Sequence, residues 1–82
     1  MYEVRVHDAA RATVDLLPAN ALAGYLDVLD LLELKPWSGP PFREDKPDGN
    51  IRTLTFGPGG LVVYMILDAA QEVHLLEVQW AG

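Results

Sequence analysis

Apolar and polar side chains alternate from Tyr2 to His7, and this period of two is typical of a half-buried β-strand. The apolar positions expected on its buried face are Tyr2, Val4 and Val6. Asp8 is expected to cap a short helix from Ala9 to Leu17, because its carboxylate can accept hydrogen bonds from the free amides of the first turn. The inner side of that helix is expected to hold Ala12 or Thr13, Leu16 and Leu17.

Leucines at helical spacing predict a longer second helix from about Ala19 to Leu34. Pro18 separates the two helices, because proline interrupts a helix interior but fits a first turn. The expected buried stripe consists of Leu22, Leu26, Leu29 and Leu32, widened by Tyr25 and Val28. The opposite side presents the acids Asp27, Asp30 and Glu33. A catalytic carboxylate pair is one interpretation of these acids, but a solvated helix face is the better one.

The segment from Lys35 to Asn50 contains four of the six prolines, which argue against a helix or a central strand. Trp37 and Phe42 are expected to anchor this loop on the core, with base stacking as the alternative. Three strands are predicted to follow: Ile51 to Phe56, Leu61 to Leu67, and Val73 to Trp80. The middle one is almost wholly apolar. It is therefore expected in the centre of a sheet, covered on both faces or covered on one face with a partner on the other.

The stretch FGPGGL, residues 56–61, joins the first two of these strands. A phosphate-binding loop of the Walker type would need a lysine and a hydroxyl after its last glycine, followed by a helix. Gly60 is followed instead by leucine and two valines, which favour a strand. The stretch therefore predicts a hairpin turn in which Gly59 or Gly60 has a positive φ.

The length of 82 residues predicts one domain, residues 1–82, with a thin core. A formal net charge of −6 argues against attraction of nucleic acid over the whole surface, although four of the six bases lie between Lys35 and Arg52. The absence of cysteine excludes disulfides and thiolate catalysis and fits a cytoplasmic protein. No apolar run approaches the ~18 residues of a membrane span, and no secretory leader is expected.

The order strand, helix, helix, strand, strand, strand predicts an α+β fold with an N-terminal strand, a two-helix hairpin and a three-stranded antiparallel meander. Here the chain resembles the RelE/ParE toxins of bacterial toxin–antitoxin modules. The resemblance rests on YEVRVHDAAR, LLPANA, IRTLTFG and GGLVVYMILD, together with the closing VHLLEVQW. It is a resemblance of pattern and size that covers nearly the whole length. It implies a small cytoplasmic protein that is held inactive by an antitoxin peptide.

RelE-like members of this family cut messenger RNA on the ribosome, whereas ParE-like members act on gyrase. The RNA-cutting members share Arg and Lys on the second and third strands, and an Arg with a Tyr or His after the last strand. Metal-free RNA cleavage needs such groups to move protons and to stabilise the phosphorane charge. Arg52 is the one position that matches this cluster and is the candidate catalytic residue. Because the next strand has no base and no basic tail precedes Gly82, the ribonuclease site is expected to be reduced or lost.

The candidate RNA- or phosphate-binding residues are Arg43, Lys46 and Arg52. The alternative for Arg52 is an ion pair on an exposed strand face, for example with Glu77. His7 and His74 are candidate acid–base groups, although a lone strand histidine is more often structural. The sequence does not place these two histidines near each other, so it supports a metal site only weakly, and no metal or cofactor is expected.

Three functions are compatible with these observations. The first is a toxin or toxin-derived protein that acts mainly by protein binding. The second is a ribosome-dependent messenger RNA endoribonuclease that uses Arg52, and the third is a small non-toxic protein-interaction domain with the same fold. The expected partner is an antitoxin-like protein or peptide, joined by the ribosome and messenger RNA in the second case. A homodimer is an alternative, because so small a chain gains stability from extra burial.

Overall fold

The computed structural model describes residues 1–81. Its helices are α1 (Asp8–Val14) and α2 (Ala19–Leu34), and two 3-10 turns follow, η1 (Pro36–Ser38) and η2 (Asp68–Ala70). Its strands are β1 (Glu3–Val6), β2 (Ile51–Phe56), β3 (Gly60–Leu67) and β4 (Glu72–Trp80). The predicted order of elements is confirmed. Within this described part, every helix is too short or too polar to cross a membrane.

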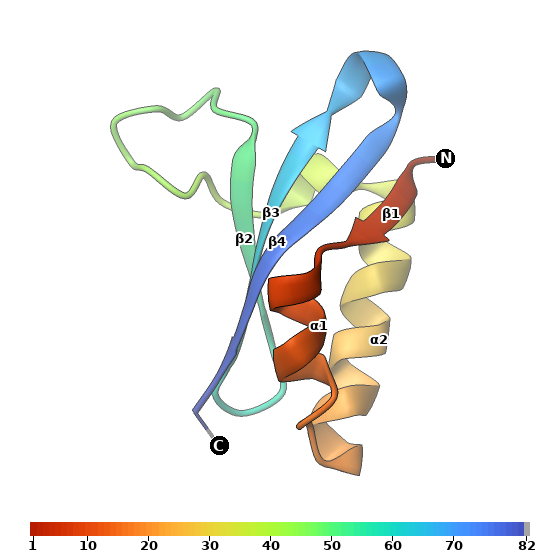
Figure 1. The fold of residues 1–82 in the computed structure, drawn as a ribbon. Helices are drawn as coiled ribbons and strands as arrows, with labels where there is room; N and C mark the ends of the chain where they lie inside the picture. Colours follow the sequence, from red (N-terminus) through yellow and green to blue (C-terminus); the bar gives the residue numbers. More distant parts are fainter. Residues whose placement is uncertain (82) are drawn as a thin grey trace.

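The four strands form one sheet in the order β1-β4-β3-β2 (Figure 1). β2, β3 and β4 are antiparallel neighbours, as the predicted meander requires, whereas β1 pairs with β4 in parallel. A parallel pair needs a long connection between its strands, and here both helices and two further strands lie between them. The α+β prediction is confirmed, and the sheet is mixed.

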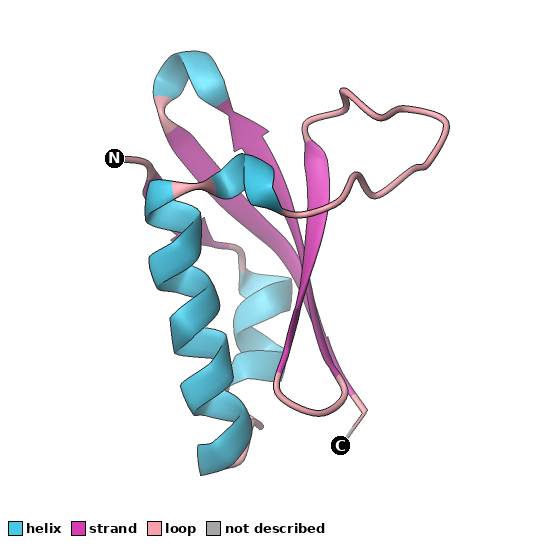
Figure 2. Ribbon diagram, turned by 180° about the vertical axis from the view of Figure 1, so that it is seen from behind, coloured by secondary structure: helices cyan, strands magenta, loops and turns pink. Residues whose placement is uncertain are grey.

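Both helices cover the same face of this sheet (Figures 1 and 2). The buried side chains that α2 contributes are Ala21, Tyr25, Val28 and Leu32. They meet a layer from the two central strands that comprises Val62, Tyr64, Ile66, Val73, Leu75 and Val78. The hydroxyl of Tyr64 donates to the carbonyl of Pro36 over 2.6 Å, so this buried polar group is satisfied and ties β3 to η1.

The hairpin between β2 and β3 has the predicted turn. Gly59 has φ 81°, and Gly57 also lies in the left-handed region with φ 47°. The turn packs against α2, where a Cβ at Gly24 would lie 3.1 Å from the backbone nitrogen of Gly57. Glycine at position 24 costs helix propensity of up to ~1 kcal/mol, but it allows the helix and the hairpin to approach this closely.

The first helix differs from its prediction in both bounds and face. Asp8 is not the cap, because His7 holds that position, although its side chain makes no capping hydrogen bond. Asp8 lies in the first turn, where its charge suits the helix dipole. The helix also ends at Val14 rather than Leu17. Ala10 is fully buried in place of Ala12, and Leu16 is 77% exposed because it lies beyond the helix end.

The second helix has the predicted bounds, but its buried face is rotated. Leu26 was expected in the core and is 50% exposed, while Leu22 and Leu29 are half-buried. Tyr25 takes the central position instead and meets Phe56 edge to face, with ring centroids 6.0 Å apart. Most residues of this helix are apolar, so periodicity alone could not select its buried side.

The long loop before β2 is not anchored in the predicted way. Trp37 and Phe42 are 41% and 56% exposed, so neither reaches the core. The indole of Trp37 donates to the carboxylate of Asp68 over 3.2 Å, and the hydroxyl of Tyr2 donates to the same carboxylate. Polar contacts therefore join the loop to η2 and the N-terminus, while the middle of the loop projects away from the sheet (Figure 2).

Candidate functional site

The face of the sheet opposite the helices is open, and its centre is apolar. The side chains that β3 places there are Leu61, Val63, Met65 and Leu67. Val63 is only 6% exposed although it lies outside the helix-side core cluster. Helices therefore cover β3 on one face only, which is the second of the two predicted arrangements. The partner for the other face stays a prediction.

The charges on this open face are mostly negative. Among the described strand residues that share it, Arg5 is the one arginine or lysine, and its guanidinium is 3.1 Å from Glu3 and 3.2 Å from Glu72. Glu77 adds a further exposed carboxylate on β4. The face therefore offers an anionic substrate no unpaired guanidinium or ammonium group from its strands.

Arg52 lies on the other side of β2, where it holds the long loop. Its guanidinium donates to the carbonyls of Gly49, Gly39 and Pro47 over 3.0, 3.1 and 2.8 Å. It also stacks over Trp37, 4.9 Å from the ring centroid. The alternative considered for Arg52, an ion pair with a strand carboxylate such as Glu77, is therefore wrong. Backbone carbonyls accept from its guanidinium, and Glu77 lies on the opposite face of the sheet.

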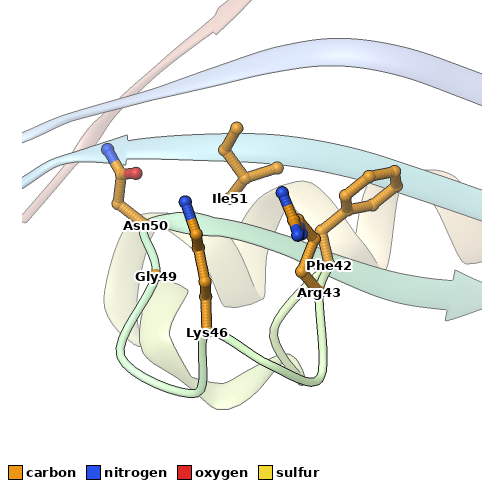
Figure 3. A pocket seen from close by; sticks show the side chains of 6 residues that line it. All are labelled: Phe42, Arg43, Lys46, Gly49, Asn50 and Ile51. Atoms are coloured by element: carbon orange, nitrogen blue, oxygen red, sulfur yellow. The ribbon is translucent and has the colours of Figure 1, made fainter.

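A pocket of about 270 Å³ opens between the loop and the start of β2 (Figure 3). Phe42 and Ile51 supply apolar surface, and Arg43, Lys46 and Asn50 supply polar atoms. The structure thus brings together Arg43 and Lys46, two of the three candidate phosphate-binding residues, but not Arg52. Arg43 is partly neutralised, since it forms two hydrogen bonds with Asp45, of 3.0 and 2.8 Å. Phosphate binding here stays a prediction.

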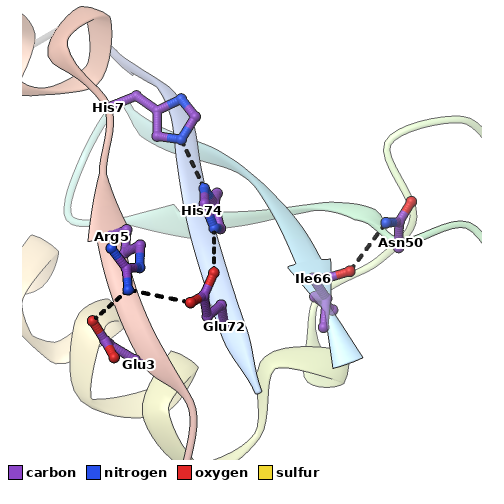
Figure 4. Close-up of polar contacts among 7 residues, drawn as sticks. All are labelled: Glu3, Arg5, His7, Asn50, Ile66, Glu72 and His74. Carbon is purple, nitrogen blue, oxygen red and sulfur yellow. Dashed lines mark hydrogen bonds and ion pairs between the residues drawn. The ribbon is translucent and has the colours of Figure 1, made fainter. Parts of the chain in front are cut away.

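The two histidines, which lie far apart in the sequence, are in direct contact (Figure 4). His7 Nε2 is 2.9 Å from His74 Nδ1, and the rings are nearly perpendicular, at 83°. On its other side, His74 Nε2 is 3.0 Å from a carboxylate oxygen of Glu72. The hydrogen bond from His74, followed by the nearby charge of Arg5, holds the pKa of Glu72 below its ordinary value.

Sequence patterns could not reveal this cluster. Its members come together because β1 pairs with β4 in parallel, which sets Arg5 opposite His74. The alternation of β1 did place His7 and Arg5 on one face, but the identity of the neighbouring strand carried no sequence signal.

A groove of about 480 Å³ runs between β1 and α2. Its lining combines apolar side chains with two acids and consists of Met1, Tyr2, Glu3, Val4, Val6, Leu29 and Glu33. β1 is an edge strand, so its side toward this groove is not paired with another strand. Of the acidic ridge expected on α2, Asp27 and Asp30 are exposed, and Glu33 borders the groove.

No protein-family model matches the chain, and no curated protein matches it significantly. Solved structures do match. A chain of the RelBE2 toxin–antitoxin complex from Mycobacterium tuberculosis is 26% identical, with 98% of each chain covered and a TM-score of 0.77. The isolated RelE toxin of E. coli is 14% identical, with a TM-score of 0.81 over 100% of this chain and 86% of the other. A chain of the archaeal RelE–RelB complex from Pyrococcus horikoshii is 16% identical, with 99% and 96% covered and a TM-score of 0.67.

Proposed function

We propose that this chain, which has the RelE-like toxin fold, is the toxin-like component of a toxin–antitoxin module and acts mainly by binding a partner protein. Its ribonuclease site is reduced or lost, and it works in the cytoplasm. The neighbours include complexes of a RelE protein with RelB, which makes an antitoxin-like partner the first candidate.

The composition of the open sheet face is the observation that carries this proposal. RNA cleavage without a metal needs cations placed around the phosphorane and groups that transfer protons at both oxygens. Arg5, the one such cation among the described strand residues of that face, is held by Glu3 and Glu72. Arg52 uses its donors on the loop. Losing one preorganised electrostatic contact typically costs ~10²–10³ in rate, so the absence of an unpaired arginine or lysine among the described strand residues of this face supports binding rather than cleavage.

The groove between β1 and α2, of about 480 Å³, is the surface that we assign to such a partner. An extended segment can pair with the free edge of β1 while its apolar side chains contact Val4, Val6 and Leu29. Because Glu3 and Glu33 border the groove, the segment is expected to carry Lys or Arg beside its apolar residues. Pairing would also cover an edge strand that is otherwise open to aggregation.

Binding can be tested with the product of a small gene that neighbours or overlaps the coding sequence. Glu33→Lys should weaken the complex by about tenfold in a calorimetric titration, because it reverses a charge at the groove. Asp27→Lys, which makes the same charge change on α2 outside the groove, should bind like the wild type. Equal loss in both variants, or no loss in either, would place the partner elsewhere. Absence of any such gene would favour the non-toxic interaction domain.

Cleavage can be tested separately with ribosomes and messenger RNA. We expect the wild-type protein to cut weakly or not at all. Robust cutting that Arg52→Ala abolishes, with Arg52→Ala still folded at the assay temperature, would overturn the binding proposal and establish the ribonuclease that uses Arg52.

A further inference from the structure

We propose that His7 and His74 form a binding site for a divalent transition-metal ion such as Zn²⁺ or Ni²⁺, at the junction of β1, α1 and β4. This inference rests on the geometry of the histidine cluster in Figure 4 and does not depend on the toxin-like function. It also departs from the expectation drawn from the sequence, which could not place the two imidazoles side by side.

The two facing nitrogens have nearly the separation that one metal ion requires. Two nitrogens bound tetrahedrally at about 2.0–2.1 Å from Zn²⁺ lie roughly 3.3 Å apart. His7 Nε2 and His74 Nδ1 are 2.9 Å apart, so the two rings would need to separate by a few tenths of an ångström and to tilt until both lone pairs point at one ion. His7 is exposed and can make this movement, while the His74 side chain is only 19% exposed and stays fixed.

Glu72 orients His74 in the way that carboxylates orient metal-bound histidines. A carboxylate accepts the Nε2 proton of His74 over 3.0 Å, which leaves the lone pair on Nδ1, the atom that faces His7. Arg5 in turn holds the other oxygen of Glu72 at 3.2 Å. His7 forms no other side-chain hydrogen bond among residues 1–81, so it is free to adopt the tautomer whose Nε2 carries a lone pair.

The protein would supply two ligands, and water would complete the coordination sphere. No group of three or more His, Cys, Asp or Glu side chains within residues 1–81 is placed to hold a metal ion, so affinity should be lower than in a closed structural site. Imidazole nitrogen favours Zn²⁺, Ni²⁺ and Cu²⁺ over Mg²⁺ or Ca²⁺. The chain has two histidines and no cysteine, so no other imidazole or thiolate competes with this pair for the ion.

The first experiment is a calorimetric titration of the full chain with Zn²⁺ and with Ni²⁺. We expect one ion per chain, and His7→Gln and His74→Gln should each weaken binding by more than about tenfold. Glu72→Gln should weaken it by about tenfold, because partners of a ligating histidine typically contribute 10–100-fold in affinity. Glu77→Gln removes the same charge from β4 outside the cluster and should leave affinity unchanged. An unaltered affinity in both histidine variants would overturn the proposal.

A second measurement avoids the variants and any loss of folding. In ¹⁵N spectra of the wild-type imidazoles, Zn²⁺ should shift His7 Nε2 and His74 Nδ1, while His74 Nε2 keeps its proton and its contact with Glu72. A purely structural hydrogen bond between the rings predicts no response at millimolar Zn²⁺. That outcome, or coordination through His74 Nε2, would refute the site.

Discussion

The contacts of Arg52 predict a structural role that can be measured directly. Arg52→Ala removes the donors that hold the carbonyls of Gly39, Pro47 and Gly49. Pro47 and Gly49 lie in the projecting loop, so water can replace the guanidinium at their carbonyls at little cost. Gly39 is buried, however, and a buried carbonyl that loses its partner costs about 1–3 kcal/mol. Loss of the stacking on Trp37 adds about 0.5–1 kcal/mol.

The free energy of unfolding should therefore fall by about 2–3 kcal/mol in Arg52→Ala, as measured by urea denaturation. Arg52→Lys keeps the charge but not the planar fork, so it should recover less than half of the loss. Hydrogen exchange should accelerate at Thr53 and Phe42, whose amides donate to Pro40 and Ile51 across the same junction. A change below about 0.5 kcal/mol in Arg52→Ala would refute this reasoning and leave the residue free for a catalytic role.

Three further predictions concern the turn, the helix register and pH. Gly59→Val should cost about 1–2 kcal/mol in urea denaturation because φ is 81°, and a smaller change would mean that the turn rearranges easily. Leu32→Ala should cost about 2–5 kcal/mol and Leu26→Ala under 1 kcal/mol, since the first is fully buried and the second half-exposed; the reverse order would refute the register of α2. Hydrogen bonds from Tyr2, and then from Trp37, hold the pKa of Asp68 below its ordinary value of 3.8. These hydrogen bonds contribute fully to the free energy of unfolding above pH 3.8, and the contribution is lost as pH falls through the lower pKa of Asp68 in the folded protein. In Asp68→Asn, the free energy of unfolding should therefore fall less steeply with decreasing pH in the acid range.

Local chemistry determined much of what could be predicted. The strand bounds Ile51–Phe56, the helix bounds Ala19–Leu34 and the positive φ at Gly59 follow from alternation, periodicity and turn residues that act within a few positions. The almost wholly apolar strand lies in the centre of the sheet, as expected, and its Tyr64 is fully buried. The α+β class followed from the order of these elements, and the resemblance to RelE-like toxins is confirmed at the level of the fold.

What escaped prediction depends on neighbours that are distant in sequence. Whether Leu26 or Tyr25 faces the sheet depends on where α2 lies over the strands, which helical spacing does not encode. The loop-holding role of Arg52 depends on carbonyls of a segment without regular structure. The pairing of His7 with His74 required the parallel register of β1 and β4, and a register one residue away would turn their side chains to opposite faces.

The parallel placement of β1 beside β4 also sets an order of events during folding. β1 precedes the other strands in the chain, yet its pairing partners, such as Glu72 for Glu3, lie beyond both helices and two further strands. The hairpins β2–β3 and β3–β4 close short loops and can form without β1, whereas docking of β1 closes the longest loop between paired strands of the described residues. We therefore expect β1 to dock late in folding, onto a three-stranded sheet of β2, β3 and β4 in which one edge of β4 is still unpaired.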